Sequence, residues 1–165
     1  MNETEVKVET RSHIRNVAHF ITDIVMHLGR RAAAHDASKL KDPELQTFVE
    51  FTPKLKNSTY GSEEYHDFLK AMKPALDHHY ACNRHHPEHF DNGISGMNIV
   101  DLVEMLCDWK AATLRHADGD IVKSINYNAQ RFGITDQLRD VLLNSVDLLV
   151  YDPERVKTEN KGESL

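Results

Sequence analysis

The stretch NIVDLVEMLCDWKAATLRHA, residues 98–117, decides the fold class. It carries apolar side chains on nearly every side of a helix, so it predicts a helix that is largely buried. Nowhere in the chain do runs of about four to eight β-branched residues alternate between turn signals, so no strand is expected. The chain is therefore predicted to be all-α.

Apolar spacing on both sides of this stretch predicts further helices. Residues 12–33 repeat apolar side chains at Ile14, Val17, Ile21 and Val25, an amphipathic pattern whose apolar face is expected to point into the core. Four more helices are expected over residues 42–55, 62–79, 120–132 and 135–150, with Pro74 kinking or splitting the second of these and an ordered loop over residues 83–96. The prediction is one bundle of about six helices over residues 12–150, with an extension at 1–11 and a loose polar tail at 151–165.

Composition excludes several classes of function. The 165 residues carry a net charge of -6, so no basic field is expected to hold bulk nucleic acid. No apolar run approaches the roughly 20 residues that cross a bilayer, so no membrane association is expected. The opening MNETEVKVET lacks the pattern of a signal peptide, and Cys82 and Cys107 form no CxxC pair. The expected setting is the cytoplasm.

Histidine is the unusual residue, with 11 copies. Five of them lie within twelve residues: His78, His79, His85, His86 and His89. His79 continues the apolar stripe of its helix and is expected to point inward, and imidazole nitrogens are ligands of transition-metal ions. Arg84 in the same segment suggests a phosphate partner. The alternative is a histidine-rich loop that only contacts solvent.

Two further groups of residues add imidazole and carboxylate ligands. His35 and Asp36 are adjacent and can grip one ion, although a surface loop explains the pair equally well. His13 lies four residues before Val17, which places it on the apolar face, as a ligand or a core histidine. His19 is rotated about 120° from His13 and is expected to face solvent.

Residues 98–117 also carry an acidic row. Asp101, Glu104 and Asp108 fall within about 60° of one another on the predicted helix. A buried carboxylate must be paired or bound to a metal, because an isolated buried charge costs several kcal/mol. The alternative is that this row is the one solvated stripe of the helix.

The order His13, His35-Asp36, His79, His85-His86 and Asp108 resembles the HD superfamily of helical metal-dependent phosphohydrolases. The stretches HDASKL, DHHYACNRHHPEHF and MNIVDLVEMLCDWKAATLRHADGD are similar, more specifically, to an uncharacterised HD-like family of bacterial and phage proteins, over about residues 12–150. The resemblance implies that the metal ligands are His13, His35, Asp36, Asp108, His79 and His85 or His86. Lys39 stands where several HD nucleotidases carry glutamate, which brings the site closer to HD phosphodiesterases.

The resulting hypothesis is a phosphohydrolase that acts on a nucleotide or related small phosphate ester through metal-activated water. Its cofactor is expected to be one or two divalent ions of Fe, Mn, Zn, Co or Ni. Lys39 would neutralise phosphoryl charge, and Glu104 would orient a histidine or act as general acid. The expected substrate-binding residues are Asn83, Arg84 and Lys110. The competing hypotheses are a non-catalytic metal-binding or ligand-sensing module and a helical interaction protein without metal. A homo-oligomer is also possible.

Overall fold

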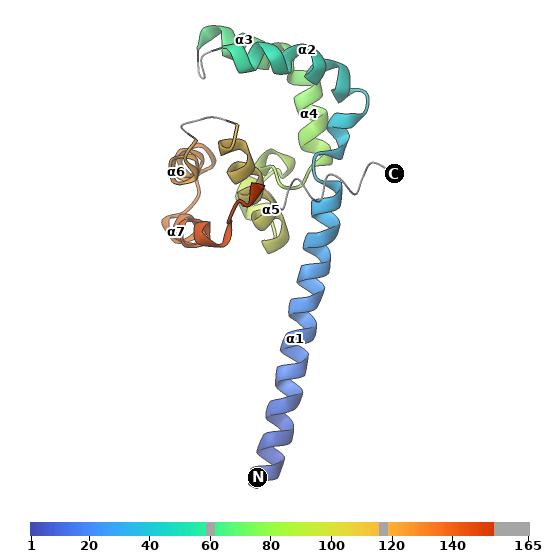
Figure 1. The fold of residues 1–165 in the computed structure, drawn as a ribbon, viewed down its shortest axis with the longest axis vertical. Coiled ribbons are helices and arrows are strands. Elements are labelled where there is room, and N and C mark those ends of the chain that lie inside the picture. The colour runs from blue at the N-terminus through green and yellow to red at the C-terminus, as the bar shows by residue number, and fades with distance from the viewer. Residues whose placement is uncertain (59–61, 116–118, 154–165) are drawn as a thin grey trace. The chain divides into compact units, whose positions relative to one another are not determined.

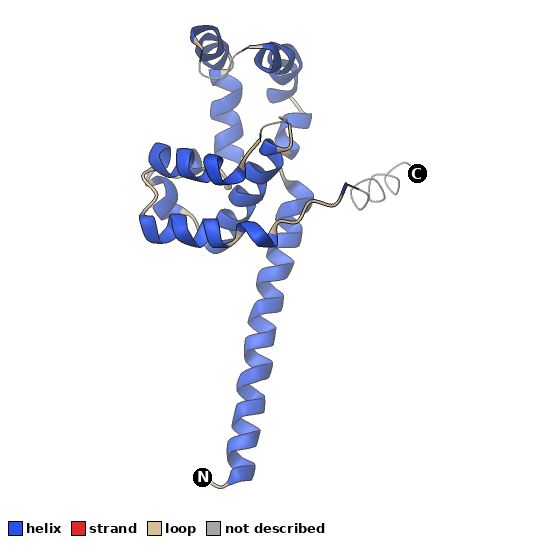
Figure 2. Cartoon of the chain, turned by 60° about the vertical axis from the view of Figure 1, so that its left-hand side comes forward, coloured by secondary structure: helices blue, strands red, loops and turns tan. Residues whose placement is uncertain are grey.

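The structure is a computed structural model that describes residues 1–58, 62–115 and 119–153 (Figure 1). Every regular element in these ranges is a helix, as the colouring in Figure 2 shows, and this confirms the all-α prediction. The α-helices are α1 (Glu3–Ala34), α2 (Glu44–Asn57), α3 (Glu63–Ala71), α4 (Lys73–Cys82), α5 (Ile99–Thr113), α6 (Ile121–Phe132) and α7 (Asp136–Asn144). The short 3-10 helices are η1 (Ala37–Leu40), η2 (Pro87–His89), η3 (Gly93–Gly96) and η4 (Val146–Leu148).

The first helix is longer than its apolar pattern indicated. α1 begins at Glu3 because the Asn2 side chain accepts a hydrogen bond from the Glu5 backbone N–H, while the Glu5 side chain accepts one from the Asn2 backbone N–H. This reciprocal cap satisfies two donors that a helix start otherwise leaves open. The residues expected as an extension, 1–11, therefore largely belong to the helix.

The apolar face of α1 is the main departure from the expected packing. Ile14, Val17, Ile21 and Val25 were expected to face the core, but they are between 41% and 59% exposed, and no residue of α1 is buried. The amphipathic period shows only that one face is apolar, and says nothing about what covers it. In Figure 1 the first turns of α1 extend away from α2, α3 and α4.

Three of the other α-helices begin at side chains that cap them, as their sequences indicate, whereas α2 and α4 begin without a side-chain cap. The side chains of Ser62, Asp120 and Thr135 cap α3, α6 and α7, and Gly133 ends α6 with a left-handed φ of 63°. The segment with Pro74 is two helices, because a proline in the first turn suits the start of α4 and not a helix interior. The expected loose tail lies almost entirely outside the described residues.

The chain divides into two compact units, Met1–Met105 and Leu106–Leu165, with the boundary inside α5. In the second unit, α6 and α7 contact each other, and the Trp109 ring stacks on Phe132 with centroids 6.5 Å apart. In the first unit the buried side chains are mostly polar: Glu44, His79, Asn83, His85, Asp101 and Glu104, against Met72, Ala75, Pro87 and Met105. Polar side chains are rarely buried in such numbers for packing alone, so these residues are the candidates for a functional site. Among the described residues, no helix meets the length and hydropathy required to cross a membrane.

Candidate metal centre

The centre begins where the chain leaves α1. Asp36 has a φ of 54°, in the left-handed region that aspartate and asparagine adopt more readily than other side chains. Its Oδ2 accepts a hydrogen bond from Lys39 Nζ at 2.6 Å. Its Oδ1 is buried and accepts no hydrogen bond from any described residue. One oxygen of Asp36 is thus neutralised by an ammonium group, and the other points into the polar interior.

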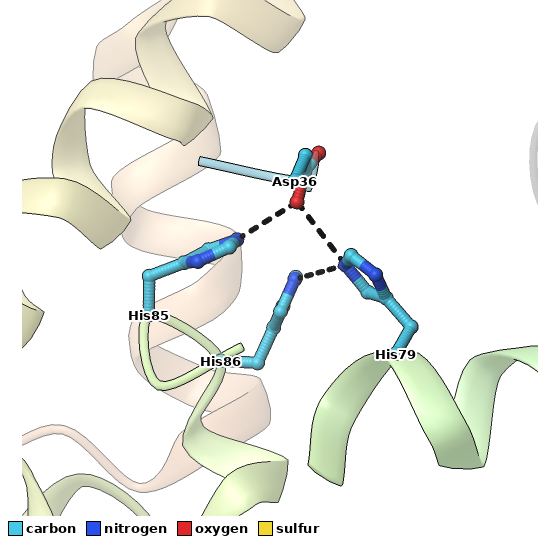
Figure 3. Close-up of side chains that lie close together, drawn as sticks. All are labelled: Asp36, His79, His85 and His86. Carbon is cyan, nitrogen blue, oxygen red and sulfur yellow. Dashed lines mark hydrogen bonds and ion pairs between the residues drawn. The ribbon is translucent and has the colours of Figure 1, made fainter. Parts of the chain in front are cut away.

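Three histidines converge on Asp36 from α4 and the segment that follows it (Figure 3). Asp36 Oδ1 lies 3.3 Å from His79 Nε2 and 3.5 Å from His85 Nε2. His86 Nε2 lies 2.9 Å from His79 Nε2. Four tetrahedral ligands bound at about 2.1 Å lie roughly 3.4 Å apart, close to the separations of Asp36 Oδ1 from the His79 and His85 nitrogens. The four side chains therefore have the chemistry and the spacing to hold one ion.

Glu44 determines which nitrogen of His79 faces this group. The buried Glu44 carboxylate accepts hydrogen bonds from His79 Nδ1 at 2.9 Å, His78 Nδ1 at 2.6 Å and Ser38 Oγ at 3.1 Å. A proton on Nδ1 leaves a lone pair on His79 Nε2, which then faces a lone pair of Asp36 Oδ1. Two acceptors at 3.3 Å repel each other unless a proton or cation lies between them. A carboxylate behind a histidine is the common support of a metal-ligating imidazole.

Both carboxylates are held ionised by their neighbours. Burial raises the pKa of Asp36, but the adjacent His79 imidazole and Lys39 ammonium outweigh burial and place the pKa far below its ordinary value. Burial also raises the pKa of Glu44, and hydrogen bonds from His78, Ser38 and His79 bring it below the ordinary value. Negative charge on Asp36 is what a cation site requires.

Glu104 stands behind a second pair of histidines. Its Oε1 lies 2.9 Å from His35 Nδ1 and 3.1 Å from His85 Nδ1, and its Oε2 lies 2.5 Å from Arg31 Nη2. Glu44 and Glu104 therefore face the Nδ1 atoms of four imidazoles between them. Glu104 is therefore placed where it could orient His35 and His85, and this role stays a prediction. Alternatively, Glu104 can join His35 and His85 as a ligand, because these three also form a group of suitable size.

Asp101 is fully buried and paired with two arginines. It accepts hydrogen bonds from Arg31 Nη1 at 2.8 Å, from Arg84 Nε and Nη2 at 3.2 and 3.0 Å, and from the Asn98 backbone N–H at 3.0 Å. Burial raises the pKa of Asp101, but the hydrogen bonds from Arg84, Asn98 and Arg31 outweigh it, so the pKa lies below its ordinary value. The interpretation of the acidic row as a solvated stripe is wrong for Asp101 and Glu104.

Three residues that were expected to act on a substrate contact other side chains of the protein: Asn83, Arg84 and Lys39. Asn83 is buried, and its Nδ2 donates to Ser38 Oγ and to the His79 carbonyl oxygen, each at 2.8 Å, so it supports His79 from inside the fold. Arg84 is 44% exposed but uses its Nε and Nη2 on Asp101, so a phosphate contact by its remaining N–H groups stays a prediction. Lys39 binds Asp36 directly, which gives it a role in positioning that ligand.

His13 does not reach the centre. It is exposed on α1, and the 22 residues between it and His35 correspond to about 33 Å along a continuous helix. The prediction that His13 and His35 bind one ion within a chain is wrong. The helix continues without a break from His13 to Ala34, so the chain cannot fold back and bring the two histidines together. Asp108 and Lys110 lie on α5 in the second unit, and their roles at the centre stay predictions.

Sequence reasoning missed Glu44 and Arg31. Glu44 follows Pro43 at the start of α2, where an acidic side chain favours a helix through its dipole alone, so nothing local indicates burial. Arg31 lies in the last turn of α1, where a basic side chain is favourable for the same reason.

A cationic cleft borders this part of the first unit. Its volume is about 460 Å³, and its lining residues are His27, Arg30, Arg31, Arg84, Asn98, Ile99 and Val100. Guanidinium groups are suited to phosphate and carboxylate ligands. The cleft therefore offers an anion a place close to the Arg31 and Arg84 pairs with Asp101.

Comparison with known proteins identifies the family. A family model described as "Family of unknown function (DUF5662)" matches residues 2–148, which include α1 to α7 and every residue of the centre. The chain belongs to this family. Searches of the curated proteins and of the solved structures found no match. The description of the DUF5662 family carries no activity, so the function of this member has to be argued from its side chains.

Replacing Glu44 with glutamine tests its part in the centre. The amide oxygen of Glu44→Gln can accept a hydrogen bond from one histidine Nδ1–H, but the amide nitrogen is a donor and cannot accept from the other histidine. We therefore expect metal affinity to fall about 10- to 100-fold. Metal affinity would be measured by competition with a chromogenic chelator. The matched control is Glu50→Gln, an exposed glutamate on the same helix that pairs with Lys54. Equal metal affinity in the two variants would contradict the role assigned to Glu44.

Proposed function

We propose that this protein is a metal-dependent phosphohydrolase that acts on a nucleotide or a related small phosphate ester. Asp36, His79, His85 and His86 would hold a divalent transition-metal ion. The observation that carries the proposal is the buried Asp36 Oδ1, which faces two imidazole Nε2 atoms at 3.3 and 3.5 Å and has no hydrogen-bond donor among the described residues. The resemblance to HD phosphohydrolases supports the class of reaction.

The charges around Asp36 support one ion over two. If Asp36 bridged two ions, the second ion would bind its Oδ2 atom. Lys39 Nζ already lies 2.6 Å from this oxygen. Like charges a few ångströms apart repel strongly in a partly buried site. His35 Nε2, 3.7 Å from the same oxygen, is then left for a role other than ligation.

The number of ligands bears on the identity of the ion. Four protein ligands fill the tetrahedral sphere of a structural zinc site, whereas Mn, Fe, Co and Ni in six-coordinate sites keep two positions for water and substrate. Catalysis therefore favours one of these four metals. A closed zinc sphere favours the second candidate function, a non-catalytic metal-binding or ligand-sensing module.

The proposed roles follow from the hydrogen bonds of each group. A bound ion would lower the pKa of a water molecule and polarise a phosphoryl oxygen. Glu44 and Glu104 would keep protons on Nδ1 atoms, so that the Nε2 atoms of His79 and His85 serve as ligands. Glu104 has both oxygens engaged with His35, His85 and Arg31, which leaves it poorly suited to be a general acid. His35, 31% exposed, is the better group for moving a proton.

The arginines support a phosphorylated substrate. Arg30 and Arg84 line the cationic cleft, and their guanidinium groups would hold phosphoryl oxygens. The choice of a nucleotide rests on the HD resemblance, because the cleft itself recognises only the anion.

The test combines metal content with hydrolysis. Protein purified without a histidine tag would be stripped of metal and reconstituted separately with Mn, Fe, Co, Ni and Zn. Each form would be assayed for phosphate release from mononucleotides. Cyclic nucleotides would be assayed with an added phosphatase, which releases phosphate from the mononucleotide product. We expect one ion per chain and hydrolysis with at least one of the first four metals. Tight binding without hydrolysis by any metal would favour the non-catalytic module. Failure to bind any of the five would overturn both and leave a helical interaction protein.

A further inference from the structure

Arg30 lines the cationic cleft without a partner among the residues that the structure describes. Its side chain is exposed and forms no hydrogen bond or ion pair with any of them. Three arginines line the cleft, and the carboxylates of Asp101 and Glu104 pair only with Arg31 and Arg84. Arg30 therefore keeps its charge and its N–H donors for a ligand. A guanidinium group beside a cleft of about 460 Å³ is suited to a dianion such as a phosphate group.

The cleft and the metal centre are separate places that share one support. None of the four proposed ligands is among the described residues that line the cleft. Arg31, which does line it, lies with Nη2 2.5 Å from Glu104 Oε2. Glu104 Oε1 lies 3.1 Å from His85 Nδ1, and His85 Nε2 faces Asp36 (Figure 3). Arg31, Glu104 and His85 thus form a chain of contacts from the cleft to the metal centre.

We infer that a dianion bound in the cleft strengthens metal binding through Arg31 and Glu104. Arg31 divides its positive charge between Asp101 and Glu104. A dianion beside Arg31 compensates part of this charge, so the carboxylate of Glu104 acts more strongly on the His85 imidazole. A more basic imidazole is a better metal ligand. The charge of the dianion also attracts a nearby cation, so both effects have the same sign.

The coupling works in both directions. Because it is a free energy shared by two sites, a bound ion strengthens binding of the dianion by the same factor. A phosphohydrolase built in this way would hold its ion most tightly while a phosphate group is present. The coupling rests on the metal centre of the proposed function. The anion site requires neither a bound metal nor hydrolysis.

Calorimetric titration of sulfate into metal-free protein tests the anion site. Sulfate has the charge and shape of a phosphate dianion and is a weak metal ligand. We expect one sulfate per chain, with a Kd of about 1 mM or tighter. Arg30→Gln removes a guanidinium group that holds no ion pair among the described residues, so it should weaken binding about 10-fold or more without loss of helix.

The matched control for Arg30→Gln is Arg15→Gln. Arg15 is an exposed arginine of α1 that does not line the cleft, so its replacement should leave sulfate binding unchanged. The two substitutions remove the same charge from the same helix. Equal sulfate affinity in the parent and both variants, or no sulfate binding by the parent, would overturn the anion site.

The affinity for Zn²⁺, measured by competition with a chromogenic chelator, tests the coupling. In saturating sulfate the parent should bind Zn²⁺ about 5-fold more tightly than in chloride of equal ionic strength. Arg30→Gln should lose this increase. Arg31→Lys keeps the positive charge, but an ammonium group lacks the fork that reaches two carboxylates, so this variant should bind sulfate and lose most of the increase. Circular dichroism would check that both variants are folded.

The outcomes separate this inference from the proposed function. An equal Zn²⁺ affinity of the parent in sulfate and chloride would overturn the coupling, and an increase retained in Arg31→Lys would overturn its route. If the parent binds no Zn²⁺, the metal centre and the coupling both fail, and the sulfate titration still decides the anion site. Hydrolysis is not part of any of these measurements.

Adenosine monophosphate in place of sulfate identifies the source of the phosphate group. Ile99 and Val100 give the cleft an apolar part that a free ion does not use. Tighter binding of the nucleotide than of inorganic phosphate by the metal-free protein would assign the cleft to a phosphate group of the substrate. Equal or weaker binding would assign it to free phosphate. In either case Arg30→Gln should weaken binding, and an unchanged affinity in that variant would overturn the site.

Discussion

Asp36→Asn is expected to abolish metal retention while the helices remain intact. The substitution keeps the size of the side chain and suits the left-handed φ of 54°, so the turn after α1 should survive. It removes the only anionic ligand among the four and leaves Lys39 without its carboxylate. We expect a loss of affinity greater than the roughly 100-fold that removal of a supporting carboxylate causes. Elemental analysis should show near one ion per chain in the parent and essentially none in the variant.

The comparison variants separate ligation from folding. Asp36→Ala would remove the ligand and also place a less tolerant side chain at a left-handed position, so a difference in thermal stability between the two variants isolates the backbone effect. His13→Ala and His19→Ala change exposed histidines of α1 and should leave the metal content unchanged. If Asp36→Asn retained the ion while His13→Ala lost it, the centre described above would be wrong.

Asp101→Asn is expected to cause the largest loss of stability. Asp101 is fully buried and neutralises Arg31 and Arg84, so the substitution leaves Arg84 without its carboxylate, while Arg31 keeps its ion pair with Glu104. Breaking a buried pair from one side costs about 3–5 kcal/mol, which urea unfolding followed by circular dichroism would measure. Because Arg84 is partly exposed, we expect the lower end of this range. The control is Asp67→Asn, an exposed residue that pairs with Lys70, whose effect should stay within about 0.5 kcal/mol.

The same residue predicts a dependence of stability on pH. The pKa of Asp101 is lower in the folded protein than in the unfolded chain, where it is near 3.9. The unfolded state therefore takes up a proton first as the pH falls. The stabilisation is fully present above the unfolded pKa and is lost as the pH falls below it through the folded pKa. The free energy of unfolding should fall less in acid for Asp101→Asn than for the parent. An equal decrease in the two proteins would contradict this assignment.

Helix ends were predictable because they depend on neighbours in sequence. Ser62, Asp120 and Thr135 each cap a helix where a short polar side chain precedes an apolar period, and Gly133 ends one with positive φ. His79 was placed inward by the apolar stripe of its own helix, and it is buried. These interactions span about four residues, the range of a helical turn.

The covering of α1 was not predictable in the same way. The apolar period identified the face that carries Ile14 and Ile21, and the assumption that this face meets the core of the same chain placed His13 at the metal centre. In the structure the helix continues without a turn to Ala34, so His13 and His35 lie far apart. An apolar face is equally suited to a neighbouring element or to a second molecule, and its pattern does not distinguish them.

By itself, the sequence determined the all-α class, the capped starts of α3, α6 and α7, and the collection of imidazoles and carboxylates between His35 and Glu104, because composition and local capping decide these. Only the tertiary structure decided which of these groups meet. Glu44 reaches His79 across 35 residues, and Glu104 reaches His35 across 69. No period or cap encodes such contacts, because they arise when separate helices pack and buried charges must find partners.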